Sequence, residues 1–389
     1  MRSMPVVIDI MVREWKRIFS LSVHYWALVV MPPVLFFLYA GIYQEQKVRD
    51  LPMAVYDEDH SAATRQLIYL LEQTETIHFT RSINNYDELR DAMRKNEIMG
   101  AVHFPRRMES DIKSRKPTTV TLYTNAAYLV PAKLIYKDAA QVLLTGGSGV
   151  ILQKLVKKGM NPAKAMALVQ PIVVSTYSLY NPDYNYREYL VPGLITVAIQ
   201  MMIIMAAVLM LNYERTTKSM EELVVLAKGS ASHIIMGKTL AHLTVSWINW
   251  VLVAWVIFPA FSIGDGMAGW NFFIIYSLMA LACIGLGSMV SAIAQDTMLA
   301  TDIGLFYTSP AFVFSGYTFP KWGMPWYDQF YAHLLPYSWF LDGFIKVFTM
   351  GLPLSYAMPE ISALLLFSAI SYPVAILVLQ RQCNKILGV

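Results

Sequence analysis

The sequence predicts a membrane all-α bundle of six transmembrane helices with an inserted extracytoplasmic α/β domain. Its 389 residues are 56% hydrophobic and only 15% charged, whereas a soluble chain is about a quarter charged. The charges are also uneven, being dense in residues 45–117 and absent from several stretches of the C-terminal half. This contrast indicates one polar domain and one lipid-embedded body.

The first segment, residues 1–19, is predicted to be an amphipathic helix on the cytoplasmic membrane face. A plain cytosolic extension of the first span is the alternative. The apolar run that follows is too long for the core of a cleavable signal peptide, so we expect the N-terminus to be retained. The apolar residues at helical spacing are Val7, Ile8, Met11, Val12, Trp15, Ile18 and Phe19, with Asp9, Arg13, Lys16 and Arg17 on the other side.

Six apolar stretches approach the roughly 20 residues that a helix needs to cross the hydrocarbon layer. Helix is expected because backbone N–H and C=O groups find no water there. Pro32 and Pro33 should kink the first stretch, and the fifth is short. The stretches are residues 20–44, 188–213, 239–263, 270–295, 303–320 and 360–381.

Orientation follows from the short connections between these stretches. Lys and Arg gather before the first span, in residues 214–238, and where the sixth span meets the tail 382–389 (Arg381 and Lys385), whereas the connection between the third and fourth spans has none. The positive-inside rule therefore places both termini and residues 214–238 in the cytoplasm. Residues 321–350 are rich in Trp and Tyr and broken by prolines, so we expect re-entrant or interfacial short helices on the outer side.

Between the first two spans, residues 45–187 change to the pattern of a small α/β sandwich. Strands are expected at 51–56, 77–80, 99–104 and 118–123, and helices at 64–71 and 87–94. A third helix, 105–114, should open with Pro105 in its first turn. Residues 131–169 should be helical, with an interruption at Gly146, Gly147 and Gly149.

No catalytic or metal site is expected. Asp57, Glu58, Asp59 and His60 are adjacent, but side chains on an extended chain point in alternating directions, which favours a solvated turn over a metal site. The two cysteines lack metal-ligand spacing. The scattered charge, with no basic run, argues against a nucleic-acid partner.

A nucleotide-binding loop is also not expected. Gly237-Lys238-Thr239 matches the end of a P-loop, but Ser232 stands at the first glycine position and the lysine adjoins a span. We therefore expect no cofactor on this chain and an energy source elsewhere.

The segments around the second span carry a family resemblance. Tyr189-Leu190-Val191-Pro192-Gly193 opens that span, residues 212–223 (NYERTTKSMEEL) follow it, and Gly237-Lys238 precedes the third span. Together with residues 314–320, Met324-Pro325 and residues 334–338, they resemble the ABC-2 type transporter permease family, in the exporter branch with a large extracytoplasmic domain after the first span. Thr216, Lys218 and Ser219 depart from the family's second Glu and its Gly-Thr pair.

The resemblance implies a permease subunit of an ATP-driven exporter in the bacterial inner membrane, moving a drug-like, lipid or other amphiphilic substrate. It implies a partner ABC ATPase that binds the ATP and Mg, and in this branch often a periplasmic adaptor. A second permease copy, in a homodimer or heterodimer, is expected because six helices wall only half a pathway. The alternative is a non-transporting membrane receptor or scaffold whose extracytoplasmic domain binds a partner. A membrane-embedded enzyme would need clustered acidic or His residues at one depth, and none stand out in the sequence.

Residues 214–238 are the expected coupling segment. Met220, Leu223, Val224 and Ala227 recur at helical spacing, which suits a short helix that docks on a partner by its apolar side. A plain positive-inside anchor is the alternative. The residues proposed for ATPase coupling are Glu214, Arg215, Lys218, Glu221, Glu222 and Leu223.

Several polar residues lie inside the spans. Gln200, His242 and Asn249 are candidates for function, but hydrogen bonding between helices explains them equally well, so no role and no substrate site is assigned. Gly285, Gly287, Ser288 and Ser291 in the fourth span predict close helix packing.

Overall fold

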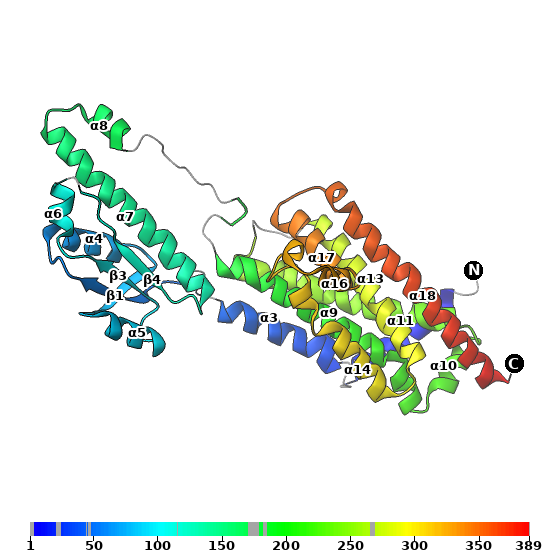
Figure 1. Ribbon diagram of the computed structural model, residues 1–389. Helices are drawn as coiled ribbons and strands as arrows, with labels where there is room; N and C mark the ends of the chain where they lie inside the picture. The colour runs from blue at the N-terminus through cyan, green and yellow to red at the C-terminus, as the bar shows by residue number, and fades with distance from the viewer. Residues whose placement is uncertain are drawn as a thin grey trace. The chain divides into compact units, whose positions relative to one another are not determined.

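The computed structural model describes residues 4–20, 25–43, 45, 48–114, 116–169, 179–181, 185–264 and 269–388. The chain divides into two compact units, shown in Figure 1. Unit 2 is the continuous stretch 47–177, and unit 1 is formed by the chain on either side of it, residues 1–46 and 178–389.

Unit 2 holds a four-stranded sheet in the order β2-β1-β3-β4. Its strands are β1 (Leu51–Asp57), β2 (Ile77–Ser82), β3 (Gly100–Phe104) and β4 (Thr121–Thr124). β1 pairs in parallel with β2 and β3, and β4 runs antiparallel to β3. Each observed strand overlaps one that was expected from the sequence.

Helices cover both faces of this sheet (Figure 1). Met53 and Val102 point to the face where α4 (Ala62–Glu72) and α7 (Leu129–Lys157) pack. Ala54 and Ala101 point to the other face, against α5 (Tyr86–Arg94). Side chains of successive strand residues alternate between the two faces, so one strand serves both cores.

Two expectations for unit 2 are wrong. Helix α6 spans Met108–Lys113 rather than beginning at Pro105, because Arg107 just before it is left-handed, with φ 65°. Helix α7 runs through its glycines without a break. A Cβ at Gly146 would lie 2.5 Å from Leu67 Cδ2, so this glycine allows α7 to approach α4. The chain turns instead at Gly159, whose φ is 86°, before α8 (Pro162–Val169).

Unit 1 contains four helices in its described part that are long and apolar enough to cross a membrane. They are α9 (Tyr186–Thr216), α11 (Ala231–Val251), α13 (Trp270–Ile293) and α18 (Met358–Leu387). The π-helical turn η2 (Leu252–Ile257) and α12 (Phe258–Ala260) continue α11 to Ala260, and η5 (Leu354–Ala357) precedes α18. They correspond to the second, third, fourth and sixth predicted spans.

The first and fifth predicted spans are shorter than expected among the described residues. The first is a π-helical turn, η1 (Trp26–Val30), followed by α3 (Met31–Ile42). Pro32 and Pro33 have no backbone N–H to donate to the preceding turn, so the regular α-helical hydrogen bonds are interrupted there. The interruption takes the form of the π-helical turn η1. The fifth is split into α14 (Thr297–Thr308) and α15 (Ala311–Phe314) at Pro310.

Helix α13 forms the centre of unit 1, packed between α9, α11 and α18. Its two glycines face different neighbours. A Cβ at Gly287 would lie 2.5 Å from Ala207 Cβ on α9, and one at Gly285 would lie 2.3 Å from Ser371 Oγ on α18. The close packing predicted from these glycines is confirmed.

Residues 321–350 form short helices, as predicted. They are η3 (Lys321–Gly323), α16 (Trp326–His333), α17 (Pro336–Phe344) and the π-helical turn η4 (Ile345–Thr349). Trp322 and Trp326 are strongly exposed, whereas Tyr337 and Phe340 are buried in the core of unit 1. This segment therefore has an apolar surface on one side and a packed side on the other.

Candidate functional site

Two short elements lie beside the ends of the long helices of unit 1: α1 (Met4–Ile18) and α10 (Met220–Leu226). α1 packs along the first part of α11, and α10 contacts α1, α9, α11 and α18. A Cβ at Gly237 would lie 2.7 Å from Ile10 Cβ and 2.9 Å from the Val7 carbonyl oxygen. Glycine at position 237 is therefore what lets α1 lie so close to α11.

Of the apolar residues predicted for one side of α1, Val7 and Ile18 are buried in the chain. Its exposed apolar stripe contains Ile8, Val12, Trp15 and Phe19, the spacing of a membrane-surface helix. The face packed on α11 carries two charges, because Glu14 and Arg17 are both buried. The assignment of Arg17 to the polar outer side of this helix is wrong.

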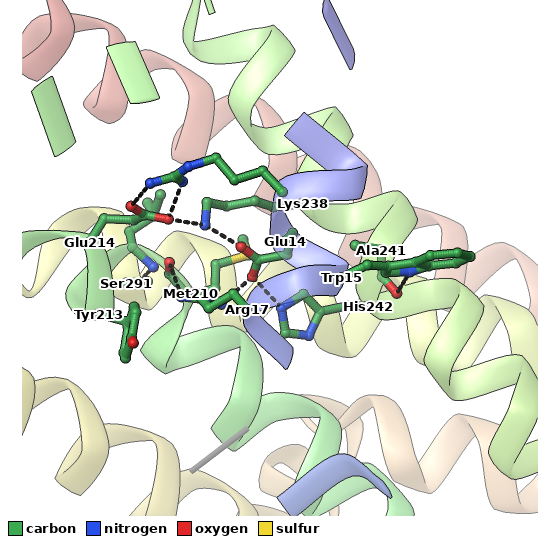
Figure 2. Close-up of polar contacts among 12 residues, drawn as sticks. Glu14, Trp15, Arg17, Met210, Tyr213, Glu214, Lys238, Ala241, His242 and Ser291 are labelled. Carbon is green, nitrogen blue, oxygen red and sulfur yellow. Dashed lines mark hydrogen bonds and ion pairs between the residues drawn. The ribbon is translucent and has the colours of Figure 1, made fainter. Parts of the chain in front are cut away.

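These buried charges belong to an ion cluster formed by α1, α9 and α11 (Figure 2). Lys238 Nζ donates to Glu14 Oε2 at 2.5 Å and to Glu214 Oε1 at 2.8 Å. Figure 2 shows the lysine between the two carboxylates. The Lys238 side chain is 0% exposed and each glutamate side chain is 1% exposed.

Each carboxylate also has a guanidinium partner. Arg13 forms a two-pronged pair with Glu214, with N–O distances of 2.7 and 2.8 Å. Arg17 donates to Glu14 Oε1, and its other terminal nitrogen donates to the Met210 carbonyl oxygen at 3.2 Å. The Arg17 guanidinium also lies over the Tyr213 ring, 4.8 Å from its centre. His242 Nε2 lies 3.0 Å from Glu14 Oε1.

The surroundings keep Glu14 ionised. Burial by itself raises the pKa of this carboxyl, but the nearby charges of Lys238 and Arg17 and the hydrogen bond from His242 outweigh it. The pKa of Glu14 therefore lies well below its ordinary value of 4.5. Three cations, Arg13, Arg17 and Lys238, face the two carboxylates of Glu14 and Glu214.

The cluster is joined directly to the start of α10. Ser219, the residue before α10, donates from Oγ to Glu214 Oε2 at 2.5 Å. The inward face of α10, with Leu223 and Val224 fully buried, packs in one apolar cluster with residues of α1, α9, α11 and α18. α10 is therefore joined both to Glu214 and to the ends of the long helices.

Arg215, the residue after Glu214 on α9, links the end of α9 to α13 and α18. It donates to the Ser291 carbonyl oxygen at the end of α13 at 2.7 Å and to Gln382 Oε1 on α18 at 2.8 Å. Gln382 in turn donates to the Ala292 carbonyl oxygen at 2.9 Å. These bonds satisfy carbonyl groups that the C-terminal turn of a helix leaves without internal donors.

The coupling residues predicted from the sequence fall into two groups. Lys218, Glu221 and Glu222 are exposed, whereas Glu214 is buried in the ion cluster and Leu223 in the apolar core. The apolar residues expected to contact a partner, Met220, Leu223, Val224 and Ala227, instead pack inside the chain. The apolar anchor that α10 offers outward is Val225, which is 69% exposed.

The polar candidates inside the spans have separate surroundings. His242 joins the ion cluster, and Asn249 donates from Nδ2 to the Leu28 carbonyl oxygen at 3.0 Å, a bond between helices. Gln200 is fully buried, and its amide has no hydrogen-bond partner in the described part of the chain. Lys238, the lysine of the tripeptide Gly237-Lys238-Thr239 that resembles the end of a P-loop, forms two ion pairs with Glu14 and Glu214.

Sequence reasoning missed the ion cluster as a unit. Glu14, Arg13, Arg17 and Lys238 were not singled out for function, and no acidic or His cluster at one depth was expected. A signal was present, because Glu14 stands four residues after Ile10 and four before Ile18, on the buried stripe of α1. Lys238 was noted only as part of a motif.

In unit 2 the acidic run 57–60 is a turn, as predicted. Asp57 Oδ1 accepts from the backbone N–H groups of Asp59 and His60, both at 3.0 Å. Glu58 bonds His103, 3.2 Å away. Among the residues that the structure describes, no three His, Cys, Asp or Glu side chains are grouped to hold a metal ion.

The long apolar helices and the ion cluster at their ends define a membrane-embedded protein with a separate α/β unit. A family model described as ABC-2 family transporter protein matches residues 24–377, so the chain belongs to this family. It is similar to the probable multidrug ABC transporter permease YbhR of Escherichia coli strain K12, with 21% identity over 364 residues that cover 92% of this chain and 93% of the relative. The protein of the same name from Escherichia coli O157:H7 matches equally. The chain is thus a transporter permease subunit.

Proposed function

We propose that this permease subunit belongs to an ATP-driven exporter and that the outer face of α10 is the docking site of a separate ABC ATPase. The observation that carries the proposal is the two-sided character of α10. Its inner face is packed onto the ends of the long helices. Its outer face presents two carboxylates, Glu221 and Glu222, and an exposed apolar side chain, Val225.

Such a helix suits the transfer of a mechanical displacement. An exposed apolar anchor with charged neighbours is a common way for a short helix to bind a groove. The carboxylates favour a groove with basic residues. Because the inner face is tightly packed, a push on Val225 cannot be absorbed locally and must shift the ends of α9 and α11.

The membrane arrangement that fits this proposal has six crossings. Four are the long apolar helices, and the other two are the shorter helix Leu28–Ile42 and the broken pair α14 and α15. The end that carries α1, α10 and the last turns of α18 is rich in Lys and Arg, so it faces the cytoplasm. Unit 2 then lies outside the cytoplasm, and the membrane is the bacterial inner membrane.

Lipid contact and assembly complete the proposal. α18 exposes Leu366, Ile370 and Leu377, which suits a surface facing lipid or another helix. A second permease copy, the same or a paralogue, would close the pathway. The ATPase would bind the ATP and Mg, and an adaptor would bind on the periplasmic side. The word multidrug in the name of the YbhR relatives supports a drug-like, lipid or other amphiphilic substrate.

Capture of the ATPase tests the proposal. The tagged chain, purified in mild detergent from its native membrane, should retain an ATPase with a P-loop that mass spectrometry identifies. The double variant Glu221→Lys/Glu222→Lys should retain at least about tenfold less, which corresponds to roughly 1.4 kcal/mol of binding free energy. The matched control is Asp91→Lys, an exposed acidic residue on α5 of unit 2.

Two results would contradict docking at α10. Equal retention by the double variant and the control would place the contact elsewhere. Failure of the wild-type chain to retain any ATPase, with a different protein held by unit 2, would favour the receptor or scaffold alternative.

A further inference from the structure

Lys238 occupies an unusual position for a lysine. Its side chain is fully buried in the third turn of α11, where it bonds a carboxylate from α1 and another from α9. Burying an ammonium group is unfavourable unless it is paired and hydrogen-bonded. The lysine is therefore held in place by Glu14 and Glu214 together.

Charge neutralisation does not explain this lysine. Glu214 already has Arg13, and Glu14 already has Arg17. Without Lys238, two guanidinium groups would face two carboxylates, so the charges would balance. What Lys238 adds is a direct bond from α11 to both other elements at once.

A continuous route of contacts runs through this bond. At the α10 end of this route, Ser219 just before α10 donates a hydrogen bond to Glu214. At the other side, Glu14 belongs to α1, whose last residue, Ile18, packs with Leu28 and Ala206. α10 is thus connected through Glu214, Lys238 and Glu14 to α1, and through Ile18 to the first apolar helix.

Two other polar links join α1 to α9, and neither of them includes α11. Arg17 donates to the Met210 carbonyl oxygen at 3.2 Å and lies over the Tyr213 ring. Arg13 bonds Glu214, but its side chain is 30% exposed, against 0% for Lys238. Solvent screens an exposed pair, and a long arginine side chain adapts to a shift of its partner. Lys238 is fully buried, so solvent does not screen its ion pairs and its side chain has no room to adapt to a shift of its partners.

We infer that Lys238 is a positioning residue for transport: its bonds to Glu14 and Glu214 make α1 follow α10 when the ATPase moves it. The inference rests on the proposed docking at α10 and adds the route by which the movement leaves it. α1 acts in this proposal as a membrane-surface lever, because its exposed apolar stripe of Ile8, Val12, Trp15 and Phe19 suits contact with lipid.

Distances measured between spin labels test this route without a known substrate. Labels are placed in the complex with its captured ATPase at Asp9→Cys on α1 and at Lys228→Cys just after α10, each paired with Tyr356→Cys in η5. All three positions are exposed, and the native Cys283 and Cys383 are buried. Each pair is measured without nucleotide and after trapping with Mg-ATP and vanadate.

In the wild-type complex both pairs should shift on trapping, by on the order of 1–2 Å, as packed helices do. In Lys238→Met the 228–356 distance should still shift and the 9–356 distance should not. Lys238→Arg, which can also reach two carboxylates, should restore the second shift. A lysine that only stabilises the fold would lower the yield of complex and leave both shifts intact.

A full shift of the 9–356 distance in Lys238→Met would overturn the inference. So would a wild-type complex in which position 228 moves and position 9 does not. If position 228 does not move in the wild-type complex, the docking proposal itself fails. The two labels thus separate the two failures.

Discussion

Glutamine at position 14 keeps the size of glutamate and removes its charge, so Glu14→Gln perturbs the ion cluster with little change in packing. The loss leaves three cations, Arg13, Arg17 and Lys238, facing only Glu214. Breaking a buried ion pair by removing one partner costs about 3–5 kcal/mol. We expect a loss of this size in the free energy of unfolding of unit 1.

The comparison variant Lys238→Met removes a charge from the same cluster but leaves one guanidinium for each carboxylate. It gives up two charge-assisted hydrogen bonds and also removes the desolvation penalty of a buried ammonium. We expect a smaller loss, about 1–2 kcal/mol. Asp9→Asn, on the exposed side of α1, should change stability by less than about 0.5 kcal/mol.

Unfolding in mixed micelles by SDS, followed by tryptophan fluorescence, measures these differences. All nine tryptophans belong to unit 1, so the signal reports on the unit that contains the cluster. If Glu14→Gln were no more destabilising than Lys238→Met, the assignment of Glu14 as a buried carboxylate that compensates the cations of the cluster would be refuted. If it matched Asp9→Asn, Glu14 would not be buried at all.

Three further predictions follow from the same contacts. Because the pKa of Glu14 lies well below 4.5, its contribution to stability is fully present above that ordinary value and is lost only as the pH falls through the lowered pKa. The penalty of Glu14→Gln should therefore be equal at about pH 8 and about pH 5 and shrink only in stronger acid; a penalty that halves between those two values would contradict it. Gly237→Ala should cost about 1–3 kcal/mol by forcing α1 off α11, whereas Gly41→Ala, which meets nothing within 4 Å, should be neutral or stabilise α3 by up to about 1 kcal/mol; equal melting temperatures would show that α1 is not close-packed. Ser61→Ala removes the cap that accepts from the Thr64 N–H at 3.1 Å and should cost unit 2 about 1 kcal/mol in hydrogen-exchange protection of α4; unchanged exchange would contradict the cap.

Much of the fold follows from local pattern. The second, third, fourth and sixth spans were predictable because long uncharged stretches leave helix as the only way to pair the backbone in lipid. The strands of unit 2 were predictable from short apolar runs between turns. The glycines of α13 predicted close packing, and their contacts with Ala207 and Ser371 bear this out.

Other features depended on tertiary contacts that the sequence does not display. The glycines of α7 resemble a helix break, but Gly146 is used for contact with Leu67, and a glycine costs a helix only about 1 kcal/mol. The apolar side of α10 looked like a partner surface because its partners within the chain, on α1 and α18, are distant in sequence. For the same reason the ion cluster, which joins residues more than 200 positions apart such as Glu14 and Lys238, could not be assembled from spacing.

Photo-cross-linking from position 225 tests most directly whether the outer face of α10 meets an ATPase. A benzophenone amino acid replaces Val225, and another replaces Leu144 on α7 as the control; both side chains are strongly exposed. Illumination in native membranes should attach a P-loop ATPase to position 225 and not to position 144. An ATPase attached at 144, or none at 225 while the chain remains folded and membrane-bound, would contradict the account.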